Sequence, residues 1–165
     1  MSASWTWLPA LDGDSRALGL MKRHYSWREY KDGRPHRLFV GPGEKMVLLN
    51  RECNALFVWR KFKDASGQQG VNCAVFRNEG PDTSSELIRE ACELAWARWP
   101  NERLYTYVNP KAIHSPNPGY CFKRAGWAQT GLTKGGLVIL ALAPPPLGVS
   151  RQAVKASTGP APEGK

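Results

Sequence analysis

The chain has 165 residues, of which 42% are hydrophobic, and it contains seven tryptophans. This length and composition fit one globular domain with a real core, and they exclude an intrinsically disordered chain. The formal net charge of +9 is typical of a protein with a polyanionic partner, although a solvated basic surface carries the same excess.

No apolar run approaches the roughly 20 residues of a membrane-spanning helix, and the first residues lack the basic-then-apolar order of a signal peptide. We therefore expect a cytoplasmic protein with no membrane contact. The cysteines form no C-x-x-C pair, so we expect reduced core thiols rather than a zinc site or a disulfide framework. They are Cys53, Cys73, Cys92 and Cys121.

The N-terminal part has a first segment, up to about residue 14, whose structure the sequence leaves open, followed by a predicted helix. Trp5 and Trp7 could dock on the domain or cap a strand. Ser15 is then a helix cap, and Leu18, Met21 and Tyr25 follow at helical spacing, which predicts a short helix over about residues 15–25.

A basic segment follows this helix, and its charges lie next to Tyr25, Trp27 and Tyr30. Basic residues interleaved with aromatic ones are typical of nucleic-acid-binding surfaces. We therefore expect this segment to bind nucleic acid through Arg23, Arg28, Lys31, Arg34 and Arg37.

Four β-rich runs separated by turn residues come next, at residues 38–40, 45–50, 55–62 and 71–76. They are predicted to be consecutive antiparallel strands. Trp59 and Trp27 are residue types that can stack on an extruded base, but we expect Trp59 to lie in the core.

The stretch "TSSELIREACELAWARW", residues 83–99, is the clearest helix, because it has an apolar stripe on one side and Thr83 and Glu86 at capping-box spacing. The strand at 103–108 should run parallel to the strand at 71–76, since a helix crosses between them. A short helix closed by Gly126 and a last strand at 137–142 complete a single domain over residues 1–143. Residues 144–165 are rich in Pro, Ala and Gly and predict a flexible tail.

The turn between the strand at 71–76 and the long helix has the composition of an anion site. Unpaired N–H groups at a helix start attract phosphate, and Gly80 would let the backbone come close to it. Thr83, Ser84 and Ser85 add hydroxyl donors, although such residues also cap helices in the ordinary way. Arg77 could pair with the phosphate or with Glu79.

These segments, together with "RLYTYVN" and "NPGYCFKRAGWAQTG", resemble the core of the GCN5-related N-acetyltransferase superfamily, and Arg77-x-x-Gly80 resembles part of its pyrophosphate loop. The resemblance implies an α/β (α+β) fold with a mixed, mostly antiparallel sheet and a central parallel strand–helix–strand unit flanked by helices. It also implies an acyl-coenzyme A such as acetyl-coenzyme A, bound by Val75, Phe76, Arg77, Gly80, Thr83, Ser84 and Ser85. Asp82 departs from the loop pattern. Phe122 stands where the superfamily often has a tyrosine that protonates the thiolate, with Tyr120 or Cys121 as the substitute.

"MKRHYS" and "YTYVNPKAIHSPNPGYCFKRAGWAQTG" are similar to the phage Mom-type branch of this superfamily. This similarity implies a phage or prophage enzyme in a bacterial host. Such an enzyme adds a carbamoylmethyl-type group to the exocyclic amine of adenine in double-stranded DNA, which protects the DNA from restriction. The catalytic residues that this similarity implies are His24, Tyr25, Asn109 and His114, with iron as a further cofactor held by His24 and His114. Tyr120 joins them as the substitute for the superfamily's tyrosine.

Two alternatives remain open at this point. One is an acyl-coenzyme A-dependent N-acetyltransferase that acts on a small amine or a protein. The other is a catalytically inactive, basic nucleic-acid-binding module, which Asp82 and Phe122 favour because both depart from the acetyltransferase pattern.

Overall fold

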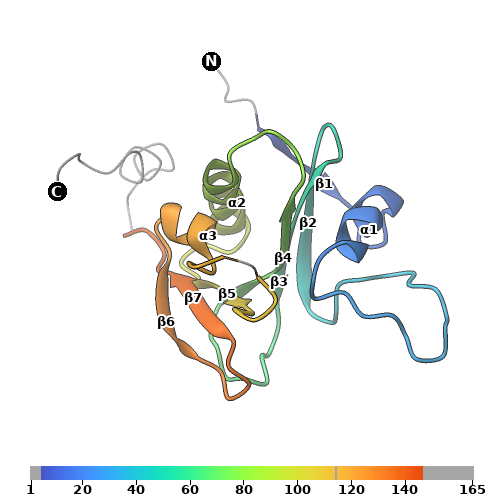
Figure 1. Ribbon diagram of the computed structural model, residues 1–165. Coiled ribbons are helices and arrows are strands. Elements are labelled where there is room, and N and C mark those ends of the chain that lie inside the picture. Colours follow the sequence, from blue (N-terminus) through green and yellow to red (C-terminus); the bar gives the residue numbers. More distant parts are fainter. Residues whose placement is uncertain (1–4, 114, 147–165) are drawn as a thin grey trace.

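A seven-stranded mixed sheet forms the centre of the molecule (Figure 1). The computed structural model describes residues 5–113 and 115–146, so His114 and the predicted tail from residue 147 onward lie outside the described residues. The strands lie in the order β1-β2-β3-β4-β5-β7-β6, and only β4 and β5 are parallel neighbours. Their bounds are β1 Trp7–Ala10, β2 Glu44–Asn50, β3 Ala55–Lys61, β4 Val71–Asn78, β5 Leu104–Val108, β6 Ala128–Leu132 and β7 Val138–Leu142. The mixed α/β class and the parallel β4–β5 pair agree with the sequence prediction.

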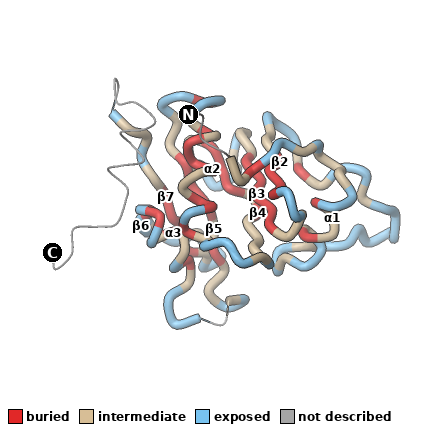
Figure 2. Tube along the Cα trace, turned by 90° about the horizontal axis from the view of Figure 1, so that it is seen from above, coloured by how far each residue is buried: buried red, intermediate tan, exposed pale blue. Residues whose placement is uncertain are grey.

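Helices cover both faces of this sheet (Figure 1). The long helix α2, Ser84–Arg98, and the short helix α3, Tyr120–Arg124, pack on one face, where Phe57 and the fully buried Trp59 belong to the larger core. Helix α1, Ser15–Lys22, packs Leu20 against the other face in a smaller core. Burial is therefore concentrated along the strands and α2, whereas the connection from α1 to β2 is mostly exposed (Figure 2).

The N-terminal segment forms the edge strand β1, which begins at Trp7, one of the two tryptophans whose role the sequence left open. Trp7 docks on α2: its backbone N–H donates to the carboxylate of Glu90 at 2.8 Å, and its indole N–H donates to the carbonyl of Leu87 at 2.8 Å. Trp7 is 2% exposed. The edge of the sheet is thereby fixed to the helix that covers it.

Helix α1 is capped and bounded differently from the prediction. Asp14, not Ser15, is the N-cap, and its carboxylate accepts from the N–H groups of Arg16 at 2.9 Å and Ala17 at 3.3 Å. The helix ends at Lys22 rather than near residue 25, so His24 and Tyr25 belong to the segment that leaves it.

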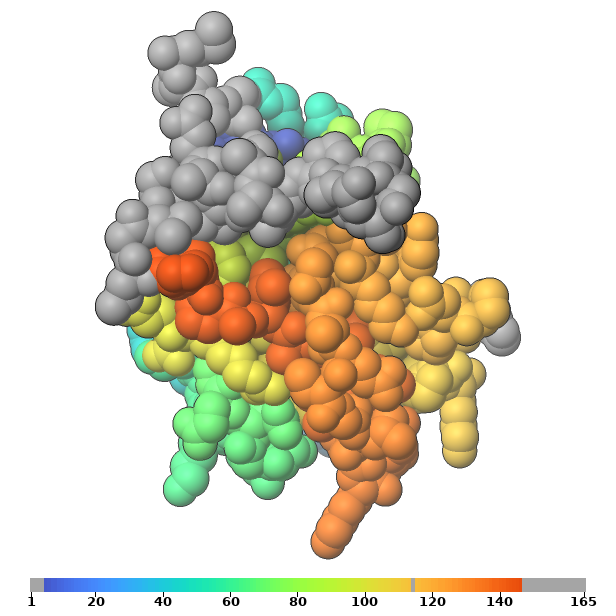
Figure 3. Space-filling model, turned by 90° about the vertical axis from the view of Figure 1, so that its left-hand side faces the viewer, coloured from blue at the N-terminus to red at the C-terminus, as the bar shows by residue number. Residues whose placement is uncertain are grey.

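One strand prediction was wrong, and one strand was missed. Residues 38–40 form no strand, because the N–H groups of Phe39 and Val40 donate to the carboxylate of Asp12, at 2.7 and 3.1 Å, and not to another strand. Strand β6 was not predicted, because it lies at the sheet edge and its residues are mostly exposed. The β6–β7 hairpin projects from the face seen in Figure 3.

Strand β4 contains a β-bulge that separates it from β5. Val75 pairs with Val58 and Cys73 pairs with Trp59, so Ala74 is one residue more than β3 can match. A bulge bends its strand and increases the twist. The pairing of β4 with β5 accordingly ends at Cys73 and Thr106, beyond which the two strands diverge.

Candidate active site

A cavity of about 660 Å³ opens where β4 and β5 diverge. Residues 73–76 of β4 and residues 106–109 at the end of β5 line two of its walls. His24, Tyr25, Ser26 and Arg28 from the segment after α1 line a third, and Tyr120 of α3 lines a fourth. The volume lies in the range of pockets that bind small molecules and cofactors, about 300–1,000 Å³.

His24 is held in the cavity wall as a neutral imidazole. Burial first, and the positive charge of Arg77 second, lower its pKa from 6.5 to about 4. Its Nδ1 accepts from the backbone N–H of Ser26 at 3.2 Å and lies 2.7 Å from the Ser26 hydroxyl oxygen. Because Nδ1 accepts, the ring proton of the neutral form is on Nε2.

Tyr25 joins the α1 side of the cavity to the β5 side. Its ring stacks on His24 with centroids 4.5 Å apart, and its hydroxyl oxygen accepts from the backbone N–H of Asn109 at 3.3 Å. Burial raises the pKa of Tyr25, and the Asn109 N–H offsets part of that rise. The phenol therefore keeps its proton at neutral pH and has it free to donate.

The remaining lining of the cavity is largely apolar. Phe76, Ile113 and Leu137 contribute side chains, and Phe122 lies between the cavity and the core. Tyr120 is 55% exposed, so its hydroxyl is accessible from solvent. Burial raises the pKa values of Cys73 and Cys121, which keeps both thiols protonated.

The structure thus brings together His24, Tyr25, Asn109 and Tyr120, the four predicted catalytic residues that it describes. Val75 and Phe76 of the predicted cofactor set line the same cavity. The imidazole and the phenol offer hydrogen-bond donors, and no carboxylate is among the described lining residues. Such a site can hold and polarise a ligand with oxygen or ring-nitrogen acceptors.

The predicted phosphate loop holds two of its own polar groups, and its pyrophosphate role stays a prediction. The N–H of Gly80 donates to the side-chain oxygen of Asn78 at 3.0 Å. The side-chain nitrogen of Asn78 donates to the Asp82 carbonyl at 2.7 Å and to the Ser84 hydroxyl at 3.0 Å. Pro81 has no N–H. The Gly80 N–H and the Asn78 amide are therefore used inside the loop, whereas Thr83 makes no capping bond with its side chain.

Glycine at position 80 also has a packing reason that was not predicted. A Cβ there would stand 2.4 Å from the side-chain oxygen of Asn54, in the β2–β3 turn. Thr83 is the N-cap residue of α2, but its side chain makes no capping bond, and Glu86 pairs with Arg89 instead of closing a capping box. Gly80 thus permits packing against the β2–β3 turn.

Arg77 takes the second of its two predicted alternatives and pairs with Glu79. Its Nε donates to one carboxylate oxygen at 2.5 Å. Arg23 donates to both oxygens of the same carboxylate, at 2.7 and 3.0 Å. The two arginines together lower the pKa of Glu79 to about 2, Arg23 being the larger cause.

The other predicted DNA-binding residues lie along the exposed connection between α1 and β2. Arg28 lines the cavity and donates to the carbonyls of Tyr25 and Trp27 at 3.0 and 2.7 Å. Arg34 pairs with Asp32 at 3.5 Å and lies over the ring of Tyr30. Lys31 and Arg37 are exposed.

A polar network around Asp64 was not predicted. The hydroxyls of Tyr105 and Tyr107 both donate to its Oδ2, at 2.8 and 2.7 Å. Tyr107 also lines the cavity, so this network supports one of its walls. Ser26, the partner of the His24 imidazole, was missed as well, and its only sequence signal is the spacing of two residues from His24.

Among residues 5–113 and 115–146, no group of three or more His, Cys, Asp or Glu side chains is placed to hold a metal ion, and no helix is long and apolar enough to cross a membrane. His24 is the described member of the predicted iron pair. The iron site therefore stays a prediction, and no step below depends on it.

Comparison of the chain with protein-family models, with curated proteins and with solved structures finds no match in any of the three.

Proposed function

We propose that the chain is a transferase that modifies the exocyclic amine of adenine in DNA, with the cavity between β4 and β5 as its active site. The observation that carries this proposal is the position of His24, Tyr25, Asn109 and Tyr120 around one cavity. His24, Tyr25 and Asn109 were selected for their similarity to Mom-type proteins, and Tyr120 as a substitute for the tyrosine of the acetyltransferase superfamily. Tyr25 and Asn109 are 84 positions apart in the chain.

The chemistry of the cavity suits a base taken out of the helix. Enzymes that act on a base in duplex DNA extrude it into a pocket, where stacking and hydrogen bonds hold it. Tyr25 and Phe76 offer aromatic rings, and the N–H of His24 and the O–H of Tyr25 match the ring-nitrogen acceptors of adenine. Arg28 adds a positive charge to the same wall.

An acyl-coenzyme A would supply an activated acyl group to the adenine amine: the new C–N bond would replace the thioester C–S bond, and coenzyme A would leave as the thiol with the proton lost by the amine. Residues 74–76 would face it from β4, because they line the cavity beyond the last pair with β5. In the β4–α2 loop the Gly80 N–H and the Asn78 amide are bonded within the loop, so the proposal assigns the pyrophosphate no contact with these two groups. The side chains in the cavity then orient the base and donate hydrogen bonds.

One observation favours a second candidate, an N-acyltransferase for a small amine. Arg23 and Arg34 are each paired with a carboxylate, so the basic segment carries less free charge than the sequence suggests. This candidate requires turnover of acetyl-coenzyme A that does not respond to DNA.

Mass spectrometry of nucleosides tests the proposal. DNA from cells that express the wild type should contain a new deoxyadenosine-derived mass, which cells with an empty vector lack. His24→Ala should abolish it, whereas Gln129→Ala, an exposed change on β6, should not. A new mass that persists in His24→Ala removes His24 from the site. No new mass, with turnover of acetyl-coenzyme A on amines, establishes the second candidate.

A further inference from the structure

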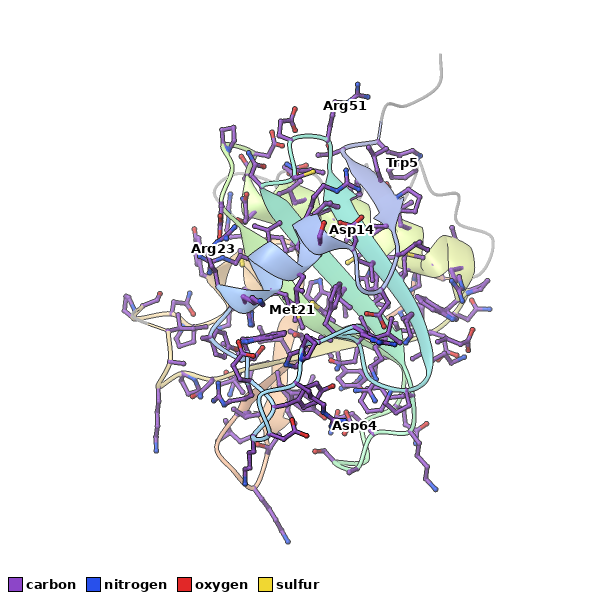
Figure 4. The ribbon with its side chains drawn as sticks, turned by 90° about the vertical axis from the view of Figure 1, so that its right-hand side faces the viewer. Trp5, Asp14, Met21, Arg23, Arg51 and Asp64 are labelled. Carbon is purple, nitrogen blue, oxygen red and sulfur yellow. The ribbon has the colours of Figure 1, made fainter. Side chains whose placement is uncertain are left out.

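Arg23 and Arg77 converge on one carboxylate beside the cavity. Arg23 follows the end of α1 and precedes His24, and Arg77 follows Phe76 in β4. Figure 4 shows Arg23 at the end of α1, away from Asp64 at the far end of the sheet. Neither arginine is among the described lining residues, but the positive charge of Arg77 acts on His24, which does line the cavity. An anion held between the two arginines would therefore lie near the His24 wall.

The pair is accessible to solvent and to competing anions. The side chains of Arg23, Arg77 and Glu79 are 54%, 33% and 28% exposed. Ion pairs this exposed contribute little to stability. Within the described part of the chain, Glu79 is also the only carboxylate that pairs with either arginine.

We propose that Arg23 and Arg77 form a binding site for a phosphate ester, and that Glu79 occupies this site in the free protein. Guanidinium groups bind carboxylate and phosphate through the same forked donor geometry, so a phosphate can take the place of the Glu79 carboxylate. The inference rests on the proposed function. That function offers two sources of this anion, the DNA backbone beside the extruded base and the phosphates of coenzyme A.

Glu79→Gln tests the site, because the amide keeps the shape of the side chain and removes the competing charge. Fluorescence anisotropy with a labelled duplex oligonucleotide should show an affinity several-fold above that of the wild type. The slope of log K against log salt should become steeper by about 1, as expected for one more phosphate contact.

The matched control is Glu102→Gln, which makes the same change in net charge. Glu102 pairs with Lys61 at 2.8 Å, and their side chains are 32% and 37% exposed. Glu102 lies just before the start of β5, and the cavity lies at the other end of that strand. It should raise the affinity much less than Glu79→Gln. Adding Arg77→Ala to Glu79→Gln should reverse the gain, and thermal unfolding of each variant confirms that it is folded.

Calorimetric titration with coenzyme A is the second arm. A gain for the oligonucleotide alone identifies the DNA backbone as the source of the phosphate, and a gain for coenzyme A alone identifies the cofactor. Equal gains in affinity in Glu79→Gln and Glu102→Gln, or no gain in affinity for either ligand, overturn the proposal. Glu79 would then only link the two arginines within the fold. A gain without any modified nucleoside overturns the proposed function and leaves the phosphate site standing.

Discussion

The hydroxyl of Tyr25 accepts a hydrogen bond from the backbone N–H of Asn109, and this contact joins the segment after α1 to the end of β5. The two residues come from opposite walls of the cavity. The bond therefore fixes how far apart these walls stand, as well as where the Tyr25 ring lies.

Tyr25→Phe should lower the free energy of unfolding by about 0.5–1.5 kcal/mol, the usual contribution of one hydrogen bond. Urea denaturation at pH 7 measures this. Tyr30→Phe is the control, because the hydroxyl of Tyr30 makes no hydrogen bond to the described residues. Equal losses in the two variants would show that the bond to Asn109 does not join the walls.

The charge of His24 predicts how stability depends on pH. Its pKa in the folded protein is about 4, below the ordinary 6.5, so the unfolded chain binds the proton first as the solution is acidified. Between pH 6.5 and pH 4 the wild type should lose up to about 3 kcal/mol of stability on this account.

His24→Gln should remove this part of the pH dependence, so the two proteins should differ most in their slope between pH 6.5 and pH 4. Denaturation over that range measures the difference, and an NMR titration of the imidazole measures its pKa directly. A midpoint near 6.5 would contradict the buried position of the ring.

Gly80→Ala should destabilise the fold by about 1–3 kcal/mol, because the added Cβ would meet the side chain of Asn54. Asn54 is itself held by Asn50 through bonds of 2.5 and 2.8 Å, so it cannot move aside freely. In a double-mutant cycle, Asn54→Ala should make Gly80→Ala less costly. A Gly80→Ala variant of wild-type stability that binds coenzyme A more weakly would instead restore the phosphate role of this loop.

Asp64→Asn should lower the stability at pH 7 by about 1–3 kcal/mol, since Tyr105 and Tyr107 would lose a charged acceptor. Burial first, and then the bond to Asp64, raise the pKa of Tyr107 to about 12, and the variant should bring it closer to 10. Spectrophotometric titration of the tyrosines measures this pKa.

Acid provides a further check on Asp64. Burial alone would raise its pKa, but the hydrogen bonds from Tyr107, Ser66 and Tyr105 outweigh this and lower it below 3.8. Its stabilising effect is therefore present above pH 3.8 and is lost as the pH falls through the folded pKa. The wild type and Asp64→Asn should converge in acid. Asp82→Asn, an exposed change, should match the wild type throughout.

The sequence predicted the elements whose side chains follow a regular period. The apolar stripe of α2 and the β-rich runs of β2, β3 and β4 each depend on local spacing, which is visible along the chain. Strand β6 has no such pattern because its residues are mostly exposed. Residues 38–40 look like a strand, but their N–H groups are satisfied by Asp12, about 27 positions earlier.

The candidate site could be predicted only in part. Similarity to Mom-type proteins selected His24, Tyr25 and Asn109, the acetyltransferase resemblance selected Tyr120, and the fold brings all four to one cavity. The pairing of Arg77 with Glu79 was one of two alternatives, because the residues are two positions apart. Arg23 lies 56 positions from Glu79, and Asp64 lies 41 and 43 positions from its tyrosines, so no local pattern revealed these contacts.

The bulge at Ala74 means that the cavity exists because β4 has one residue more than β3 can pair with. A chain that lacked this residue could continue the parallel ladder between β4 and β5, and the added backbone hydrogen bonds would favour a flatter, closed sheet. A β4 one residue shorter would thus favour continuous pairing with β5 over the cavity between the two strands. Loss of a single codon at this point would be a route from a protein with a binding site to a scaffold without one.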